Sequence, residues 1–329
     1  MCKIEGLDCV LSCMGRRLRY IPEGGALVEV TSRTVRARYL LKPSEELNEA
    51  IIGVFARAQR FYEVPLHALV CMSNHYHALI SVEDACQMAR FMNYVNGNLA
   101  KEAGRFNDWR EPFWARRYQA IVVSEEEAAQ VQRLRYILSH GCKEGLVARP
   151  QDWPGVNAAQ ALLDGTPLKG LWFNRSQEHA ARNRGKAFHR LEFATVETLH
   201  FAPIPCYRHL SKVSYRSWLG EVITDIETET RTRHAHEETA PLGARVATAV
   251  SPHGRPTAPK KSWAPLFHAA TKVARRELRE AYGWFVAAYR EAADKLRRGD
   301  LSTDFPQGSF IPSLAMIDWR YSGQARAPG

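Results

Sequence analysis

The stretch PLHALVCMSNHYHALISV, from Pro65 to Val82, decides the fold that the sequence predicts. It predicts two strands, His67 to Met72 and Tyr76 to Val82, because both runs are rich in residues that favour β-structure. Ser73 and Asn74 lie between them, and both residue types are common in tight turns. The sequence therefore predicts an antiparallel hairpin, around which we expect the rest of a sheet to form.

This hairpin carries His75 and His77 one residue apart. Alternate side chains leave the same face of a strand, so both imidazoles should point the same way. Two converging imidazoles make half of a divalent-metal site, although such pairs also occur by chance. Further along, RLRYILSHG places Tyr136 and His140 four residues apart, on one face of a predicted helix. The four residues together indicate a site far more strongly than the pair alone.

Composition limits the class of protein. The chain has 329 residues, 45% of them apolar, which is enough for a buried core and for two domains. No apolar run is long enough to span a membrane, so we expect a soluble, cytoplasmic protein. Seven cysteines without a C-x-x-C pair suggest reduced thiols, and Cys2, Cys9 and Cys13 lack a nearby fourth zinc ligand. Translation could start at Met1 or Met14.

Several local signals predict elements around the hairpin. β-Branched residues predict a first strand in ALVEVTSRTVRARYLL, which begins at Ala26. Capping residues then predict three helices, starting after Ser44, Asp84 and Ser124. A strand is predicted from Tyr118 to Val123. The sequence thus predicts a mixed α/β domain.

The net charge of +10 favours a polyanionic partner, most simply nucleic acid. Candidate contacts are basic and aromatic residues in three places. These are the polar face of the helix predicted after Asp84, the segment FNDWREPFWARRYQAIVVS, and the helix that carries Tyr136. Such side chains hold single strands by pairing with phosphates and stacking on bases, but a solvated helix face or a packed strand explains them equally well. The candidates are Arg90, Lys101, Trp114, Arg116, Arg117 and Arg133.

About half of the chain, from Arg16 to Leu163, resembles the single-tyrosine HUH transposases, and within them the REP-associated tyrosine transposases of the IS200-like superfamily. Four blocks carry the resemblance and follow the family's order: VTSR, MSNHYHALI, RYILSHG and EGLVARPQDWPGV. The resemblance implies that His75 and His77 bind Mg²⁺ or Mn²⁺ and that Tyr136 attacks DNA. The family commonly has Gln or Asn where this chain has His140, which keeps a ligand at that position and makes Mn²⁺ more plausible.

We therefore expect a ferredoxin-like antiparallel sheet with helices on one face, plus a mostly helical C-terminal extension. The expected regions are a catalytic domain (1–165), a helical accessory region (166–240), a basic Pro/Gly-rich linker (241–264) and a C-terminal helical segment (265–329).

The expected function is metal-dependent cleavage and rejoining of single-stranded DNA at hairpins, such as REP hairpins, through a 5′-phosphotyrosine, that is, DNA transposition. The expected partner is single-stranded or hairpin DNA, so we expect the protein to associate with the nucleoid in the cytoplasm. A homodimer is also possible. The alternatives are a relaxase or replication initiator, a non-catalytic nucleic-acid-binding protein, and a metal-dependent hydrolase that uses water.

Overall fold

The computed structural model describes residues 17–185, 187–257 and 265–312. The cysteines near the N-terminus, Met14, and part of the predicted linker lie outside these ranges. Within them, no helix combines the length and the apolar character needed to cross a membrane.

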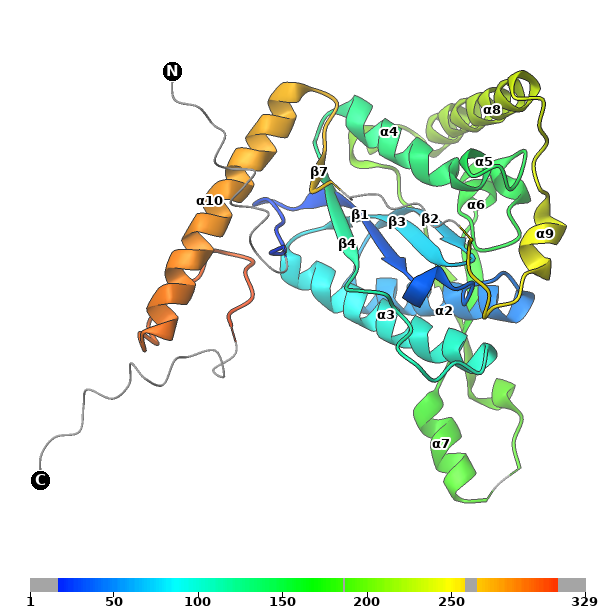
Figure 1. The fold of residues 1–329 in the computed structure, drawn as a ribbon, viewed down its shortest axis with the longest axis horizontal. Coiled ribbons are helices and arrows are strands. Elements are labelled where there is room, and N and C mark those ends of the chain that lie inside the picture. The colour runs from blue at the N-terminus through cyan, green and yellow to red at the C-terminus, as the bar shows by residue number, and fades with distance from the viewer. Residues whose placement is uncertain (1–16, 186, 258–264, 313–329) are drawn as a thin grey trace, which may run out of the picture.

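The central sheet is ferredoxin-like, as predicted (Figure 1). Its first four strands have the order β2-β3-β1-β4 and pair antiparallel, and a fifth short strand, β7, pairs parallel to β4. The elements of this unit are β1 (Ala26–Arg33), α2 (Glu45–Tyr62), β2 (Leu66–Met72), β3 (His75–Val82), α3 (Ala85–Phe106), β4 (Gln119–Val123) and β7 (Phe267–His268). The predicted hairpin is thus β2-β3, with the turn at Ser73 and Asn74.

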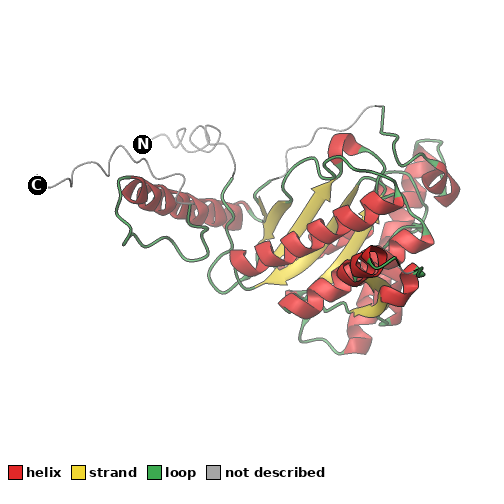
Figure 2. Ribbon diagram, turned by 90° about the horizontal axis from the view of Figure 1, so that it is seen from below, coloured by secondary structure: helices red, strands yellow, loops and turns green. Residues whose placement is uncertain are grey.

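Helices α2 and α3 cover one face of the sheet (Figure 2). Both begin at the predicted caps, since Ser44 Oγ accepts from the N–H of Leu47 and Asp84 Oδ1 from the N–H of Gln87. Their apolar stripes bury Phe55 and other large side chains against the even-numbered residues of β3. Burial of this stripe fixes the register of the hairpin, because a shift of one residue would expose it.

Helices from the later part of the chain cover the other face, so the sheet is enclosed on both sides, whereas helices on one face were predicted (Figure 1). They are α4 (Glu127–Leu138), α5 (His140–Lys143), α6 (Ala159–Asp164) and α8 (Lys212–His236). Leu134 and Leu138 of α4 pack among residues of β2 and β3. The predicted capping box at Ser124 is wrong: the N-cap is Glu126, and Ser124 Oγ donates to its carboxylate.

The region 166–240 is less helical than predicted, because it contains two antiparallel strands. Strands β5 (Leu168–Phe173) and β6 (Ala194–Leu199) flank α7 (Arg175–Asn183) and form a second, two-stranded sheet against α2. The short helix α9 (Ala244–Ala249) lies inside the predicted linker. The boundaries of the four predicted regions stay predictions.

The last helix, α10 (Lys272–Arg297), begins later than expected, with Thr271 as its N-cap. The residues before it form β7, which adds to the sheet beside β4. Glu126 holds this connection, because its carboxylate accepts from the backbone N–H groups of Ala270 and Thr271. The C-terminal helix is therefore tied to the start of α4.

Two glycines allow α2 and β5 to approach backbone to backbone. A Cβ at Gly53 would lie 2.2 Å from the carbonyl oxygen of Leu171, and one at Gly170 would lie 2.4 Å from that of Glu49. Backbone atoms cannot rotate out of the way as a side chain can, so any larger residue must push the hairpin off the helix.

We predict that Gly53→Ala lowers the free energy of unfolding by about 1–3 kcal/mol, because its methyl group must displace β5. Gly97→Ala is the matched control: it also lies inside a helix, but a Cβ there would meet nothing within 4 Å. That control should raise stability by about 0.5–1 kcal/mol through helix propensity. Urea denaturation of both variants is the measurement, and equal stabilities would contradict the close approach.

Candidate active site

The two histidines of the hairpin lie on the face of the sheet that α4 covers. His75 pairs with Arg33 and His77 with Thr31 of β1, so both sit at the end of the central strands. His77 is buried, and His75 is partly buried. Their ring centroids are 5.1 Å apart. The alternation read from the sequence therefore places both imidazoles as expected.

His140 completes a cluster with this pair. Its Nε2 lies 2.9 Å from Nε2 of His75, and its ring centroid lies 4.5 Å from that of His77. One ligand atom from each of the three residues lies within 4.8 Å of the others. Three imidazole nitrogens that converge in this way are a donor set suited to a divalent transition metal, so the cluster could hold such an ion.

Hydrogen bonds at the far side of two rings support this use. Nδ1 of His75 lies 2.6 Å from Asn74 Oδ1, and Nδ1 of His77 lies 2.6 Å from Glu29 Oε1. Both oxygens are acceptors, so each Nδ1 carries the proton and each Nε2 keeps a lone pair for the centre of the cluster. Burial lowers the pKa of His75 well below its ordinary value, with the neighbouring imidazoles acting in the same direction. The neutral, ligand-competent form is therefore favoured at neutral pH.

Glu29 is the functional candidate that sequence reasoning missed. It lies on β1 with 1% of its surface exposed, and its other oxygen, Oε2, is 2.8 Å from Nε of Arg133. Burial alone would raise its pKa, but the hydrogen bond with His77 and the charges of His77 and Arg133 outweigh that effect and lower it. The side chain is thus a carboxylate that joins the histidine strand to α4. The sequence did offer a sign of it, because Glu29 lies two residues after Leu27 and so on the same face of the predicted strand, which is buried.

Tyr136 lies beside the cluster, and its ring centroid is 5.7 Å from that of His77 and 5.5 Å from that of His140. Two cations flank its ring: Arg133 Cζ at 4.9 Å and Lys143 Nζ at 4.5 Å from the centroid. Burial raises the pKa of the phenol and the charge of Glu29 raises it further, while Arg133 acts against them. Lys143 was also missed. It lies seven residues after Tyr136, which is about two helical turns, so the two side chains can lie on the same face of a helix.

The helix that carries these residues is interrupted where one continuous helix was predicted. Helix α4 ends at Leu138, and His140 opens the short helix α5, which contains Gly141. Ser139 connects the two helices and donates through Oγ to the carbonyl of Tyr136. The interruption still leaves His140 next to Tyr136, so the predicted proximity is found although the predicted helix breaks at Ser139.

The other sequence candidates lie apart from the histidines, except Arg133. Arg90 and Lys101 are exposed on α3, which covers the opposite face of the sheet. Trp114 packs on Tyr76 and donates through Nε1 to a backbone carbonyl of α3. Arg116 and Arg117 are exposed just before β4. A role of these residues in DNA binding stays a prediction.

Together, the fold and the site define a ferredoxin-like α/β domain that carries a histidine cluster beside a tyrosine. Residues 31–140 match the family described as "Transposase IS200 like". The match is limited to this segment, and there it confirms the resemblance and the prediction of a transposase that were drawn from the sequence. It ends at His140 and contains all four residues of the site.

Solved structures of two transposases are similar to the chain, each at 18% sequence identity. The first is described as "Structure of the REP associates tyrosine transposase bound to a REP hairpin". The match covers 46% of this chain and 86% of that transposase chain, with a TM-score of 0.37. A putative transposase from Deinococcus radiodurans covers 36% of this chain and 94% of its own, with a TM-score of 0.26. No curated protein matches the sequence.

We predict that Glu29→Gln weakens Mn²⁺ binding by about 10- to 100-fold, because a neutral amide holds the His77 ring less firmly and makes it less basic. Isothermal titration with Mn²⁺ is the measurement. Glu49→Gln is the control, since Glu49 lies on α2, on the other face of the sheet. Unchanged affinity in Glu29→Gln would show that the carboxylate does not support a metal ligand.

The buried His67 and the partly buried His75 predict that the metal-free protein loses stability below neutral pH. Burial lowers the pKa of His67 to about 4 and lowers that of His75 as well, whereas both return to ordinary values on unfolding. The unfolded chain therefore binds more protons below about pH 6.5, and each group costs about 1.4 kcal/mol between pH 7.5 and 5.5. Urea denaturation in EDTA should show a loss of about 3 kcal/mol for both together, and about half of it in His75→Gln. A pH-independent stability over this range would contradict the two shifts.

Proposed function

We propose that the protein cleaves and rejoins single-stranded DNA, with Tyr136 as nucleophile and with His75, His77 and His140 as ligands of a Mg²⁺ or Mn²⁺ ion. The observation that carries the proposal is the position of Tyr136, whose ring lies within 6 Å of two of the three histidine rings in the same chain. A packing tyrosine would need neither the cluster nor the two cations around it. A single chain thus supplies the nucleophile and the proposed ligands.

The bound cation would withdraw charge from the scissile phosphodiester through one of its oxygens. The chain's own residues would do the rest. Tyr136 Oη attacks the phosphorus in line with the bond to the 3′ oxygen, and Arg133 and Lys143 stabilise the negative charge that develops on the phenol. Glu29 holds His77 and Arg133 in place by one contact to each.

The reaction conserves the number of phosphodiester bonds. As the bond from Oη to phosphorus forms, the bond from phosphorus to the 3′ oxygen breaks. The phenol loses its proton and the 3′ oxygen gains one, which leaves a 5′-phosphotyrosine and a free 3′-hydroxyl. A second 3′-hydroxyl can attack the phosphotyrosine in reverse, so strands can be rejoined without ATP.

The third imidazole, that of His140, favours one of the two metals. Nitrogen donors are softer than the oxygen donors that Mg²⁺ prefers, so three histidines favour Mn²⁺ over Mg²⁺. The net charge of +10 supports a nucleic-acid substrate. One of the two similar transposases is bound to a REP hairpin in its structure, so a single-stranded DNA hairpin is the first substrate to test.

We predict that Tyr136→Phe abolishes a covalent protein–DNA adduct, because the variant keeps the ring but lacks the attacking oxygen. The assay incubates the protein with an end-labelled single-stranded DNA hairpin and Mn²⁺ and resolves the products on a denaturing gel. Tyr94→Phe is the matched control, since Tyr94 is partly exposed on α3, across the sheet from the site.

The same gel separates the alternatives. Cleavage that survives in Tyr136→Phe would mean that water is the nucleophile and would contradict the proposal. DNA binding without any adduct in the wild-type protein, with Mn²⁺ and with Mg²⁺, would identify a binding protein that lacks catalysis.

A further inference from the structure

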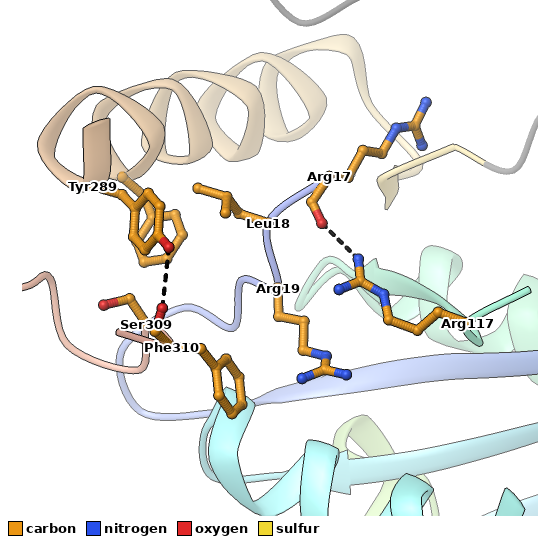
Figure 3. A pocket seen from close by; sticks show the side chains of 8 residues that line it. Arg17, Leu18, Arg19, Arg117, Tyr289, Ser309 and Phe310 are labelled. Carbon is orange, nitrogen blue, oxygen red and sulfur yellow. Dashed lines mark hydrogen bonds between the residues drawn. The ribbon is translucent and has the colours of Figure 1, made fainter. Parts of the chain in front are cut away.

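A cavity of about 200 Å³ lies away from the histidine cluster, between α10 and the start of β4 (Figure 3). Four segments that are far apart in the sequence form it: the chain before β1, the residue before Tyr118, α10, and the chain near residue 310. No acidic side chain is among the described residues that line it. Its side chains include Leu18, Arg19, Arg117, Phe285, Ser309 and Phe310.

Arg19 is held rigidly in this cavity. Its guanidinium lies 5.3 Å from the ring centroid of Tyr118 and 4.8 Å from that of Phe310, so it is placed between two aromatic rings. Among the described residues, Arg19 has no carboxylate partner, and its buried Nε has no hydrogen-bond acceptor. A guanidinium that lies between two aromatic rings and keeps one buried donor without an acceptor is suited to bind an anion.

One other polar atom nearby also lacks a partner. Ser309 Oγ is buried and has no hydrogen-bond partner within the part of the chain that the structure describes, whereas the Tyr118 hydroxyl interacts with Arg19 itself. Burial of a polar group without a partner is costly, and two such groups around one cavity suggest that a ligand supplies the missing acceptors.

The walls of the cavity are held by hydrogen bonds to the backbone. Tyr289 Oη donates to the carbonyl of Phe310 at 3.1 Å, which fixes that segment on α10. Arg117 Nη2 donates to the carbonyl of Arg17 at 2.6 Å, which fixes the first described residues against the lead into β4. These contacts are visible as dashed lines in Figure 3. The cavity is therefore a built feature of the fold.

We propose that this cavity binds a phosphate of the DNA backbone, outside the segment that is cut. The inference rests on the proposed action on DNA and adds a second anchor for that substrate. A phosphate oxygen is the acceptor that suits a guanidinium fork and hydroxyl donors. The aromatic rings at the rim leave room for the adjoining base to stack.

The sheet places this anchor within reach of the site. Gln119 of β4 pairs with Thr31 of β1, which pairs with His77 of β3. Strands β4 and β3 are therefore separated by two inter-strand spacings, or roughly 10 Å, at this level. Arg117 lies two residues before Gln119, but Tyr118 packs with the α2–α3 side of the sheet, so a DNA strand that leaves the histidines must pass the edge of the sheet to reach the cavity.

The test measures binding of the full-length protein to a fluorescent (dT)20 oligonucleotide in EDTA, by anisotropy at several NaCl concentrations. Arg19→Gln should weaken binding by at least about threefold, because it removes a charged phosphate contact. It should also reduce the slope of log affinity against log salt by about 0.7, the value for one phosphate contact on a single strand. Arg19→Lys keeps the charge, so it should restore the slope.

Arg231→Gln is the matched control, because it removes one positive charge from an exposed position on α8, which lies on the opposite side of the molecule from α10 (Figure 1). An equal loss of affinity in Arg19→Gln and Arg231→Gln would overturn the proposal, since the effect would then reflect net charge alone. Unchanged affinity in Arg19→Gln would overturn it as well.

Two further arms separate this inference from its alternatives. The covalent-adduct assay on the wild-type protein reads out the proposed chemistry, and absence of the adduct there would contradict that chemistry alone. The metal-free DNA affinities of Arg19→Gln and Arg231→Gln test the cavity, whatever the outcome of that assay. If titration with inorganic phosphate shows binding that Arg19→Gln abolishes while (dT)20 affinity is unchanged, the cavity takes free phosphate and the proposal is wrong.

Discussion

The carboxylate of Glu29 is the contact on which the candidate site depends. It is buried in the central strand, and it binds His77 with one oxygen and Arg133 with the other. A buried carboxylate is tolerated when a hydrogen-bond donor and a positive charge compensate it. Here His77 of the histidine strand is hydrogen-bonded to one oxygen, and the Arg133 guanidinium of the tyrosine helix forms an ion pair with the other. Removing Arg133 would leave an uncompensated negative charge in the core, and removing His77 would leave a buried carboxylate oxygen without its donor. The electrostatic requirement of one side chain therefore sets the spacing between β3 and α4.

The C-terminal half of the chain stabilises this arrangement from outside. Arg135 of α4 contacts Asp225 and Glu229 of α8, and Glu126 at the start of α4 binds the backbone ahead of α10. Exposed ion pairs of this kind contribute little individually. Their position matters more, because they brace both sides of the helix that carries Tyr136. The extension thus completes the second face of the sheet and belongs to the same folded body.

Local patterns in the sequence predicted the parts of the structure that local physics determines. Alternation and turn residues sufficed for the β2-β3 hairpin and for the shared direction of His75 and His77. Glu29 and Lys143 were missed because their importance depends on neighbours from other segments. Strand β7 was missed because its two residues, Phe267 and His268, carry no period of their own and form a strand only when β4 is beside them. Tertiary contacts decide such elements, and local propensity does not.

Burial and the charges around Tyr136 keep its phenol in the neutral form. Burial and the negative charge of Glu29 raise its pKa, so the side chain remains a neutral phenol at neutral pH. Arg133 acts against this shift, but Glu29 pairs with the same guanidinium and weakens its effect. In the proposed reaction, the phenol would become a strong nucleophile only when a cation in the histidine cluster and a phosphodiester are both present. The balance that stabilises the fold would then also prevent attack on unintended targets, because neither partner alone would supply enough positive charge to release the proton.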